Sequence, residues 1–165
     1  MEPNYWLILS SLSLLAPAFV SYKTRIYDLS LLCVIVTVIS SWYHYSKNPY
    51  ILYIDYPLNQ ITHLTTVYRI LPGGWASMPM YTLWLSYVVF IYYYGFVTHT
   101  LIWNPDLHAA TPWHMTLHIS TSVITSYTVY ATYVVRTKSL INTIPSEGEA
   151  SNRRFAAVDK HISYE

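Results

Sequence analysis

The stretch "ISSWYHYSKNPYILYIDYPLNQ", from Ile39 to Gln60, decides how the chain folds. It starts inside one apolar segment, passes a polar turn at Lys47 and continues into a second segment. Two long segments joined by so short a turn are typical of neighbouring membrane-spanning helices. A serine, a histidine and an aspartate lie close to this turn. Polar groups near lipid are costly and usually signal a function.

The composition of the whole chain favours a single membrane domain. Of 165 residues, 53% are hydrophobic and 10% are charged, whereas a soluble domain carries about 25% charged residues. The 18 tyrosines and 6 tryptophans suit the aromatic belts of a membrane protein. A net charge of +1 gives no basic footprint, so we expect no nucleic-acid partner. Cys33 is the single cysteine, which excludes a disulfide framework.

Five apolar segments predict an all-α membrane protein, a bundle of about five transmembrane helices, because a spanning helix needs about 20 mostly apolar residues. The third segment is the most polar and should therefore lie inside the bundle. Thr111 and Pro112 predict the cap and first residue of the fifth helix. The segments predict a transmembrane domain over 1–135, and the polar sequence 136–165 a flexible cytosolic tail. The five segments are Tyr5–Tyr22, Tyr27–Tyr45, Ile54–Leu71, Met80–Ile102 and Pro112–Val135.

Basic residues predict the orientation of these five helices. Nearly all basic residues near helix ends lie on the face that includes the C-terminal tail. The other face carries only Lys47. The positive-inside rule then places the C-terminus in the cytosol and the N-terminus in a lumen or outside the cell. In a eukaryote, this fits the endoplasmic reticulum or Golgi. The basic residues of the cytosolic face are Lys23, Arg25, Arg69, Arg136 and Lys138.

The first segment has an alternative interpretation as a cleaved signal peptide. Ala16–Ala18 reads "APA", a small-residue cleavage pattern. No basic residue precedes the apolar run, however, and signal peptides begin with a positively charged region. We therefore expect the first segment to remain as a helix of the bundle.

Four ionisable residues are expected at one membrane level, on the non-cytosolic side. They are His44, Asp55, His114 and His118. The i, i+4 spacing of the last two puts both imidazoles on one helix face. Three histidines with an open fourth position form a ligand set of catalytic zinc. His44, His114 and His118 are therefore candidate ligands of Zn²⁺, and the simpler alternative is histidines that hydrogen-bond to neighbouring helices.

Ser40 and Asp55 are the candidate catalytic residues beside this metal. Ser40 lies one helical turn before His44, where its hydroxyl could bind a substrate oxygen, and Asp55 could accept a proton. Simpler interpretations remain: Asp55 could cap the third helix, and His63 could be a buried hydrogen-bonded group. A haem site is disfavoured because its axial ligands approach from opposite sides.

The pattern Ser40-x-x-x-His44, Asp55 eleven residues later and His114-x-x-x-His118 resembles the CREST superfamily of membrane hydrolases. This superfamily includes the alkaline ceramidases and the progestin/adiponectin receptors. The spacing to Asp55 is most similar to that of the alkaline ceramidases. The resemblance implies zinc on the three histidines, contacts of Ser40 and Asp55 with its water, and hydrolysis of ceramide to sphingosine and fatty acid.

The chain is expected to have a shortened version of the seven-helix CREST fold, because two helices of that family have no counterpart here. Those helices help to enclose the lipid cavity in the family, and a homodimer could replace the missing walls. The membrane lipid substrate would be ceramide or a related lipid. The alternative function is a non-catalytic receptor or structural protein of the same superfamily, in which zinc holds the helices together.

Overall fold

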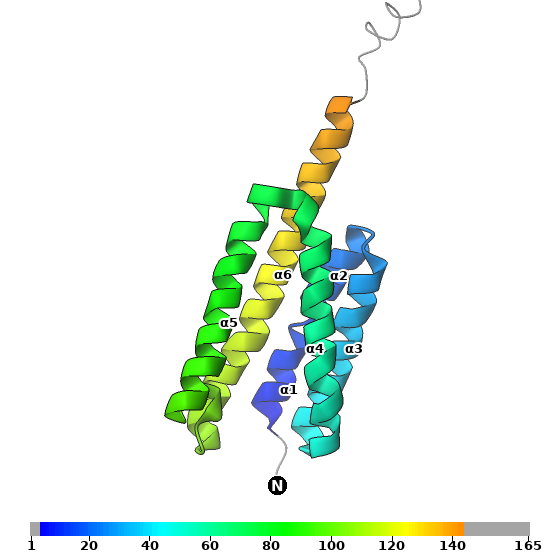
Figure 1. The fold of residues 1–165 in the computed structure, drawn as a ribbon. Helices are drawn as coiled ribbons and strands as arrows, with labels where there is room; N and C mark the ends of the chain where they lie inside the picture. The colour runs from blue at the N-terminus through cyan, green and yellow to red at the C-terminus, as the bar shows by residue number, and fades with distance from the viewer. Residues whose placement is uncertain (1–3, 144–165) are drawn as a thin grey trace, which may run out of the picture.

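The computed structural model describes residues 4–143, and this part of the chain is helical with no strand. The all-α class predicted from the sequence is therefore confirmed. Figure 1 shows α6 running along the bundle, with α5 on one side and α3 and α4 on the other. The elements are α1 (Tyr5–Leu12), α2 (Leu15–Lys23), α3 (Tyr27–Ser46), α4 (Pro49–Ile70), η1 (Leu71–Ala76), α5 (Met78–Thr98), η2 (Leu101–Trp103) and α6 (Leu107–Thr143).

Three helical stretches are long and apolar enough to cross a membrane: Tyr5–Lys23, which comprises α1 and α2, Tyr27–Ser46 and Met78–Thr98. This agrees with an integral membrane protein. The helix α4 is less apolar because it carries a polar face. That face is turned inward, since Asp55 and Thr66 on it are buried. The prediction that the whole segment lies inside the bundle is wrong, because its opposite face is exposed, with Tyr53 at 75% and Leu64 at 70%.

The first predicted segment is divided into α1 and α2 by a break at Ser13. Pro17 has no N–H to donate to the Ser13 carbonyl, and its ring crowds the same oxygen. The Ser13 carbonyl instead accepts the Ala16 N–H at 2.9 Å and a second hydrogen bond from the Ser122 hydroxyl on α6. The break therefore turns a carbonyl of the first helix toward the last helix of the bundle.

The helix α4 begins at Pro49, five residues before the predicted Ile54. Its start is fixed locally, because Asn48 Oδ1 accepts the Tyr50 N–H at 3.0 Å and proline suits the first turn of a helix. The interpretation of Asp55 as the cap of this helix is therefore wrong.

The helix α6 begins at Leu107, so the prediction that Thr111 caps it and Pro112 opens it is wrong. Asp106 Oδ1 accepts the His108 N–H at 2.9 Å, and the Thr111 hydroxyl donates to the Leu107 carbonyl at 2.7 Å. The helix continues to Thr143, beyond the predicted boundary at residue 135. Residues 144–165 of the predicted tail lie outside the described residues.

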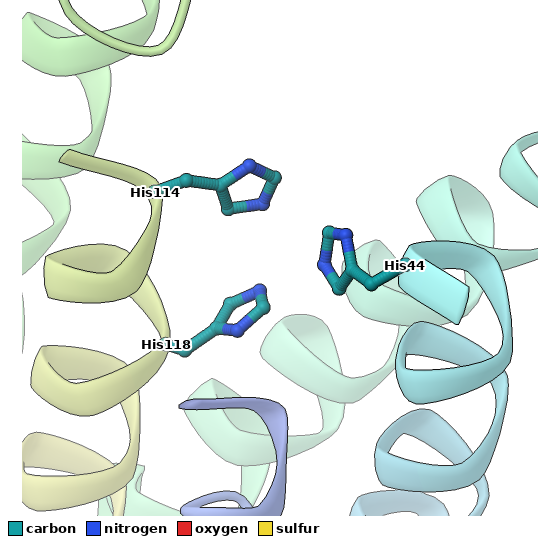
Figure 2. A group of neighbouring side chains, drawn as sticks. All are labelled: His44, His114 and His118. Carbon is teal, nitrogen blue, oxygen red and sulfur yellow. The ribbon is translucent and has the colours of Figure 1, made fainter. Parts of the chain in front are cut away.

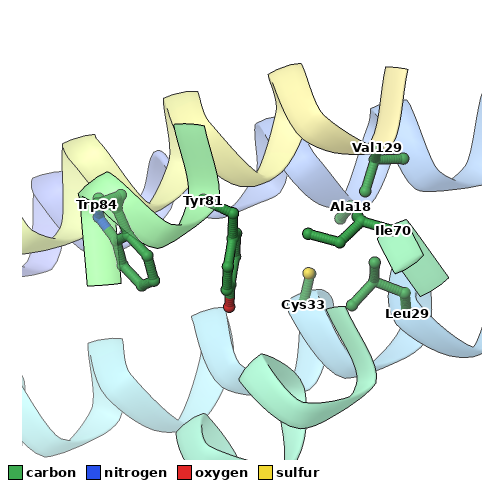
Figure 3. Packing of buried hydrophobic residues seen from close by; sticks show 7 residues of the cluster. All are labelled: Ala18, Leu29, Cys33, Ile70, Tyr81, Trp84 and Val129. Atoms are coloured by element: carbon green, nitrogen blue, oxygen red, sulfur yellow. The ribbon is translucent and has the colours of Figure 1, made fainter. Parts of the chain in front are cut away.

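The apolar core lies toward the start of α3 and the end of α4 (Figure 3). Gly73 of η1 adds a close approach there, since a Cβ at this position would lie 2.4 Å from Thr132 Oγ1 on α6. Arg69 pairs with Asp28 at the same end. The bundle is thus closed tightly at the end opposite His44. The buried core cluster comprises Ala18, Leu29, Cys33, Ile70, Tyr81, Trp84 and Val129.

Candidate metal centre

The structure brings the three predicted histidine ligands together. His44 comes from the last turns of α3, and His114 and His118 are one turn apart on α6. One ligand nitrogen of each lies within 4.8 Å of the other two. The ring centroids are 5.0 Å apart for His44 and His114, 5.3 Å for His44 and His118, and 4.9 Å for His114 and His118. This group could hold a metal ion.

The orientation of the rings supports that assignment. Figure 2 shows a ring nitrogen of each histidine directed into the space between α3 and α6. His44 is only 4% exposed, and its Nε2 is buried with no hydrogen-bond partner among the described residues. An unsatisfied buried polar atom costs about 1–3 kcal/mol. Coordination of a cation by His44 Nε2 would satisfy this atom.

The helix α1 connects the two helices that carry the ligands. The Asn4 backbone N–H donates to the His44 carbonyl at 3.3 Å, and Asn4 Nδ2 donates to Thr111 Oγ1 at 2.9 Å. Further along α1, Ser10 Oγ and Ser11 Oγ lie 3.0 Å and 3.2 Å from His118 Nδ1. The N-terminal helix therefore fixes the positions of α3 and α6 at the level of the histidines.

The two predicted catalytic residues are buried near the ends of α3 and α4 that meet at Lys47. Ser40 is 2% exposed and lies one turn from His44 on the same buried face of α3. Its hydroxyl makes no hydrogen bond within residues 4–143. Asp55 is 9% exposed, and its Oδ1 accepts Asn59 Nδ2 at 3.1 Å. Asp55 is not among the residues that could share a cation with the three histidines.

His63 lies apart from this centre and makes the hydrogen bond predicted for it. Its Nδ1 is 3.3 Å from the Tyr81 hydroxyl, and its ring centroid is 5.0 Å from that of Trp84. With Asn59 it lines a small internal cavity of about 20 Å³, which is room for about one water molecule.

Sequence reasoning missed Ser10, Ser11 and Asn4 as residues of this region. Serines that hydrogen-bond backbone carbonyls are common in apolar helices, so the run "SSLS" at Ser10–Ser13 gave no specific signal. The pairing with His118 spans more than 100 residues and depends on the docking of α1 against α6.

Comparisons of the chain with family models, with curated proteins and with solved structures find no match. The geometry and ligand set of the centre therefore carry the functional assignment.

Proposed function

We propose that the protein is a zinc-dependent intramembrane hydrolase that cleaves the amide bond of ceramide or a related lipid. The convergence of His44, His114 and His118, with an unsatisfied buried nitrogen on His44, carries this proposal. Three imidazoles leave the fourth position of a tetrahedral zinc site free, as in catalytic sites. A bound zinc ion would supply Lewis-acid polarisation of the amide carbonyl and a lowered pKa of water.

The reaction breaks the C–N bond, adds a hydroxyl to the carbonyl carbon and adds a proton to the leaving nitrogen. We assign the proton transfer to Asp55, because Asn59 engages only its Oδ1 in the structure. We assign Ser40 to the carbonyl oxygen of the substrate, because its hydroxyl makes no hydrogen bond within residues 4–143 and is free to donate one. These groups lie beside His44 in sequence or across the short turn that follows it.

The proposed setting is a bilayer crossed five times, by α1 with α2, and by α3, α4, α5 and α6. In α5, only 22% of the apolar window is buried, which suits a surface in contact with lipid. The inward polar face of α4 explains its lower hydropathy. The histidines would face the lumen and the C-terminus the cytosol. A lipid amide could then reach the centre directly from the bilayer.

Metal analysis beside a turnover assay tests this proposal. We expect about one zinc per chain of purified protein, and release of sphingosine from ceramide. The variant His118→Ala should lose both. The matched control is His108→Ala, an exposed histidine on the same helix, which should keep both. Wild-type protein that retains no zinc, or that retains zinc without cleaving ceramide or a related lipid amide, would contradict the proposal.

A non-catalytic zinc-stabilised receptor or structural protein is the second candidate, and one observation favours it. The helices α3 and α6 have little direct packing and are connected mainly through α1, α2 and α4. A cation shared by His44, His114 and His118 would join them. Turnover that falls in Ser40→Ala while zinc stays bound supports the hydrolase. Protein that holds zinc and cleaves no lipid amide supports the structural role.

A further inference from the structure

We propose that Ser10 and Ser11 are positioning residues that hold His118 in the tautomer and orientation needed for metal binding. The inference rests on the metal centre of the proposed function. It concerns a part of the chain, the end of α1, to which neither the histidine motif nor Ser40 and Asp55 belong.

The hydrogen bonds of Ser10 and Ser11 bear on which ring nitrogen of His118 carries the proton. Ser10 Oγ and Ser11 Oγ donate to the Leu7 carbonyl at 3.0 Å and 2.8 Å. The same oxygens lie 3.0 Å and 3.2 Å from His118 Nδ1. A hydroxyl has one proton, so a serine that donates to Leu7 can only accept from the ring. We assign both hydroxyl protons to the Leu7 carbonyl, so that Nδ1 carries the ring proton and the neutral imidazole has its lone pair on Nε2.

The ring orientation agrees with this tautomer. Figure 2 shows one nitrogen of His118 directed toward His44 and His114 and the other directed away, on the side of α1. Because the serines contact Nδ1, Nε2 is the nitrogen that faces the other two rings. A lone pair on Nε2 is what a metal ligand at this position requires.

The break between α1 and α2 fixes the serines against α6. Ser13, at the end of α1, donates its hydroxyl proton to the Ser10 carbonyl at 2.6 Å, and the same oxygen lies 3.4 Å from the His118 carbonyl. Its own carbonyl, freed by Pro17, accepts from Ser122 on α6. Ser10 and Ser11 are 4% and 0% exposed, so water does not compete for their hydroxyls. These contacts hold the end of α1, with Ser10 and Ser11, against α6 beside His118.

His118 differs in this respect from the other two ligands. The side chains of His44 and His114 make no hydrogen bond within residues 4–143. Loss of the group that orients a metal-binding histidine typically weakens metal affinity about 10–100-fold. We therefore expect the serines to control how tightly the centre binds its metal.

The experiment measures Zn²⁺ affinity of the full chain in detergent, with Co²⁺ as a spectroscopic probe. We expect the double variant Ser10→Ala/Ser11→Ala to bind Zn²⁺ about 10–100-fold more weakly than wild type. Its Co²⁺ absorption bands should shift, and Ser10→Thr, which keeps the hydroxyl, should bind like wild type. The matched control is Ser21→Ala, a fully buried serine in α2 whose hydroxyl has no partner among the described residues. This control should retain wild-type affinity.

The outcomes separate this inference from the proposed function. A folded double variant with wild-type Zn²⁺ affinity overturns the role of the serines and leaves the hydrolase proposal intact. Weakened binding in the double variant of a protein that cleaves no lipid supports the serines and overturns the hydrolase. Wild-type protein without Zn²⁺ affinity overturns both. If the double variant does not fold, the single variants Ser10→Ala and Ser11→Ala decide, and wild-type affinity in both overturns the inference.

Discussion

The two ends of the bundle are built from different interactions. At the end near the start of α3, Leu29, Ile70 and Val129 are fully buried against one another's helices. At the other end, polar residues join α1 to α3 and α6 through hydrogen bonds, and His44 Nε2 has no partner within residues 4–143. Close packing is the main force that associates helices within a membrane. The apolar end should therefore support the fold, and the polar end should bind the ligand.

This contrast predicts that substitutions can change stability and metal binding separately in this molecule. The buried Nε2 of His44 lacks a partner among residues 4–143, which destabilises the metal-free polar end, and this end gains most when a cation is present. The packed end contributes the same free energy with or without metal. Substitutions at the two ends should accordingly change different measured quantities.

The largest effect on stability is expected from Leu29→Ala at the packed end. Removing a fully buried leucine side chain leaves a cavity and should lower the free energy of unfolding by about 2–5 kcal/mol. Denaturant unfolding of the metal-free protein measures this change. Leu31→Ala, a 61% exposed leucine on the same helix, is the control and should cost much less. Loss of zinc from folded Leu29→Ala protein would show that the two ends are not separable.

Zinc itself should stabilise the polar end by the next largest amount. At a free zinc concentration 100 times the dissociation constant, linkage adds about 2.7 kcal/mol to the stability of wild type. In His44→Ala this increment should vanish, because one of the three ligands is lost. Thermal unfolding with and without zinc measures it, and His108→Ala should retain the full increment. An equal increment in His44→Ala would exclude that histidine as a ligand.

The bond from Ser122 to Ser13 gives a smaller effect that tests the helix break. In Ser122→Ala, the Ser13 carbonyl loses its donor from α6 but keeps the Ala16 N–H, so the loss should cost about 0.5–1.5 kcal/mol. The cost should shrink in a Pro17→Ala background, because the new N–H can bond to the Ser13 carbonyl within the helix. A double-mutant cycle measures this coupling. Additive effects of the two substitutions would refute the role of Pro17 in freeing the carbonyl.

The smallest effect is expected from the ion pair of Asp28 and Arg69 at the packed end. Their side chains are 45% and 37% exposed, and pairs in such settings contribute about 0–1 kcal/mol. Asp28→Asn should therefore lower the stability slightly at low salt and not at all at high salt, where the charges are screened. A loss as large as that of Leu29→Ala would show that the pair, rather than packing, closes this end.

Local sequence patterns predicted much of the fold correctly. Each apolar segment predicted a helical region, although the first is divided into α1 and α2 and α6 continues to Thr143 rather than ending at Val135. The predicted starts of α4 and α6 were wrong because each helix has an earlier cap. Asn48 caps α4 ahead of Pro49, and the Asp106 side chain accepts an N–H at the start of α6, before Thr111. Pro17 in the sequence indicates the break at Ser13, because proline removes the hydrogen bond to the carbonyl four residues earlier.

Of the candidate metal centre, the sequence predicted only the residues that belong to spaced motifs. The spacing of His114 and His118 fixes their common face, and that of Ser40 and His44 does the same on α3. Ser10 and Ser11 could not be found from the sequence, because nothing local distinguishes a serine that holds a ligand from one that bonds a backbone carbonyl. Asp55 is buried, at 9% exposed, and lies outside the group of possible metal ligands.

Local sequence accounts for the helical class, the approximate helix positions and the common face of His114 and His118, because each depends on residues within a few positions of one another. Docking of separate helices brings His44 to His114 and His118, places two serines of α1 against His118 and turns the Ser13 carbonyl to α6. Those features depend on how separate helices dock, which is governed by packing over the whole bundle.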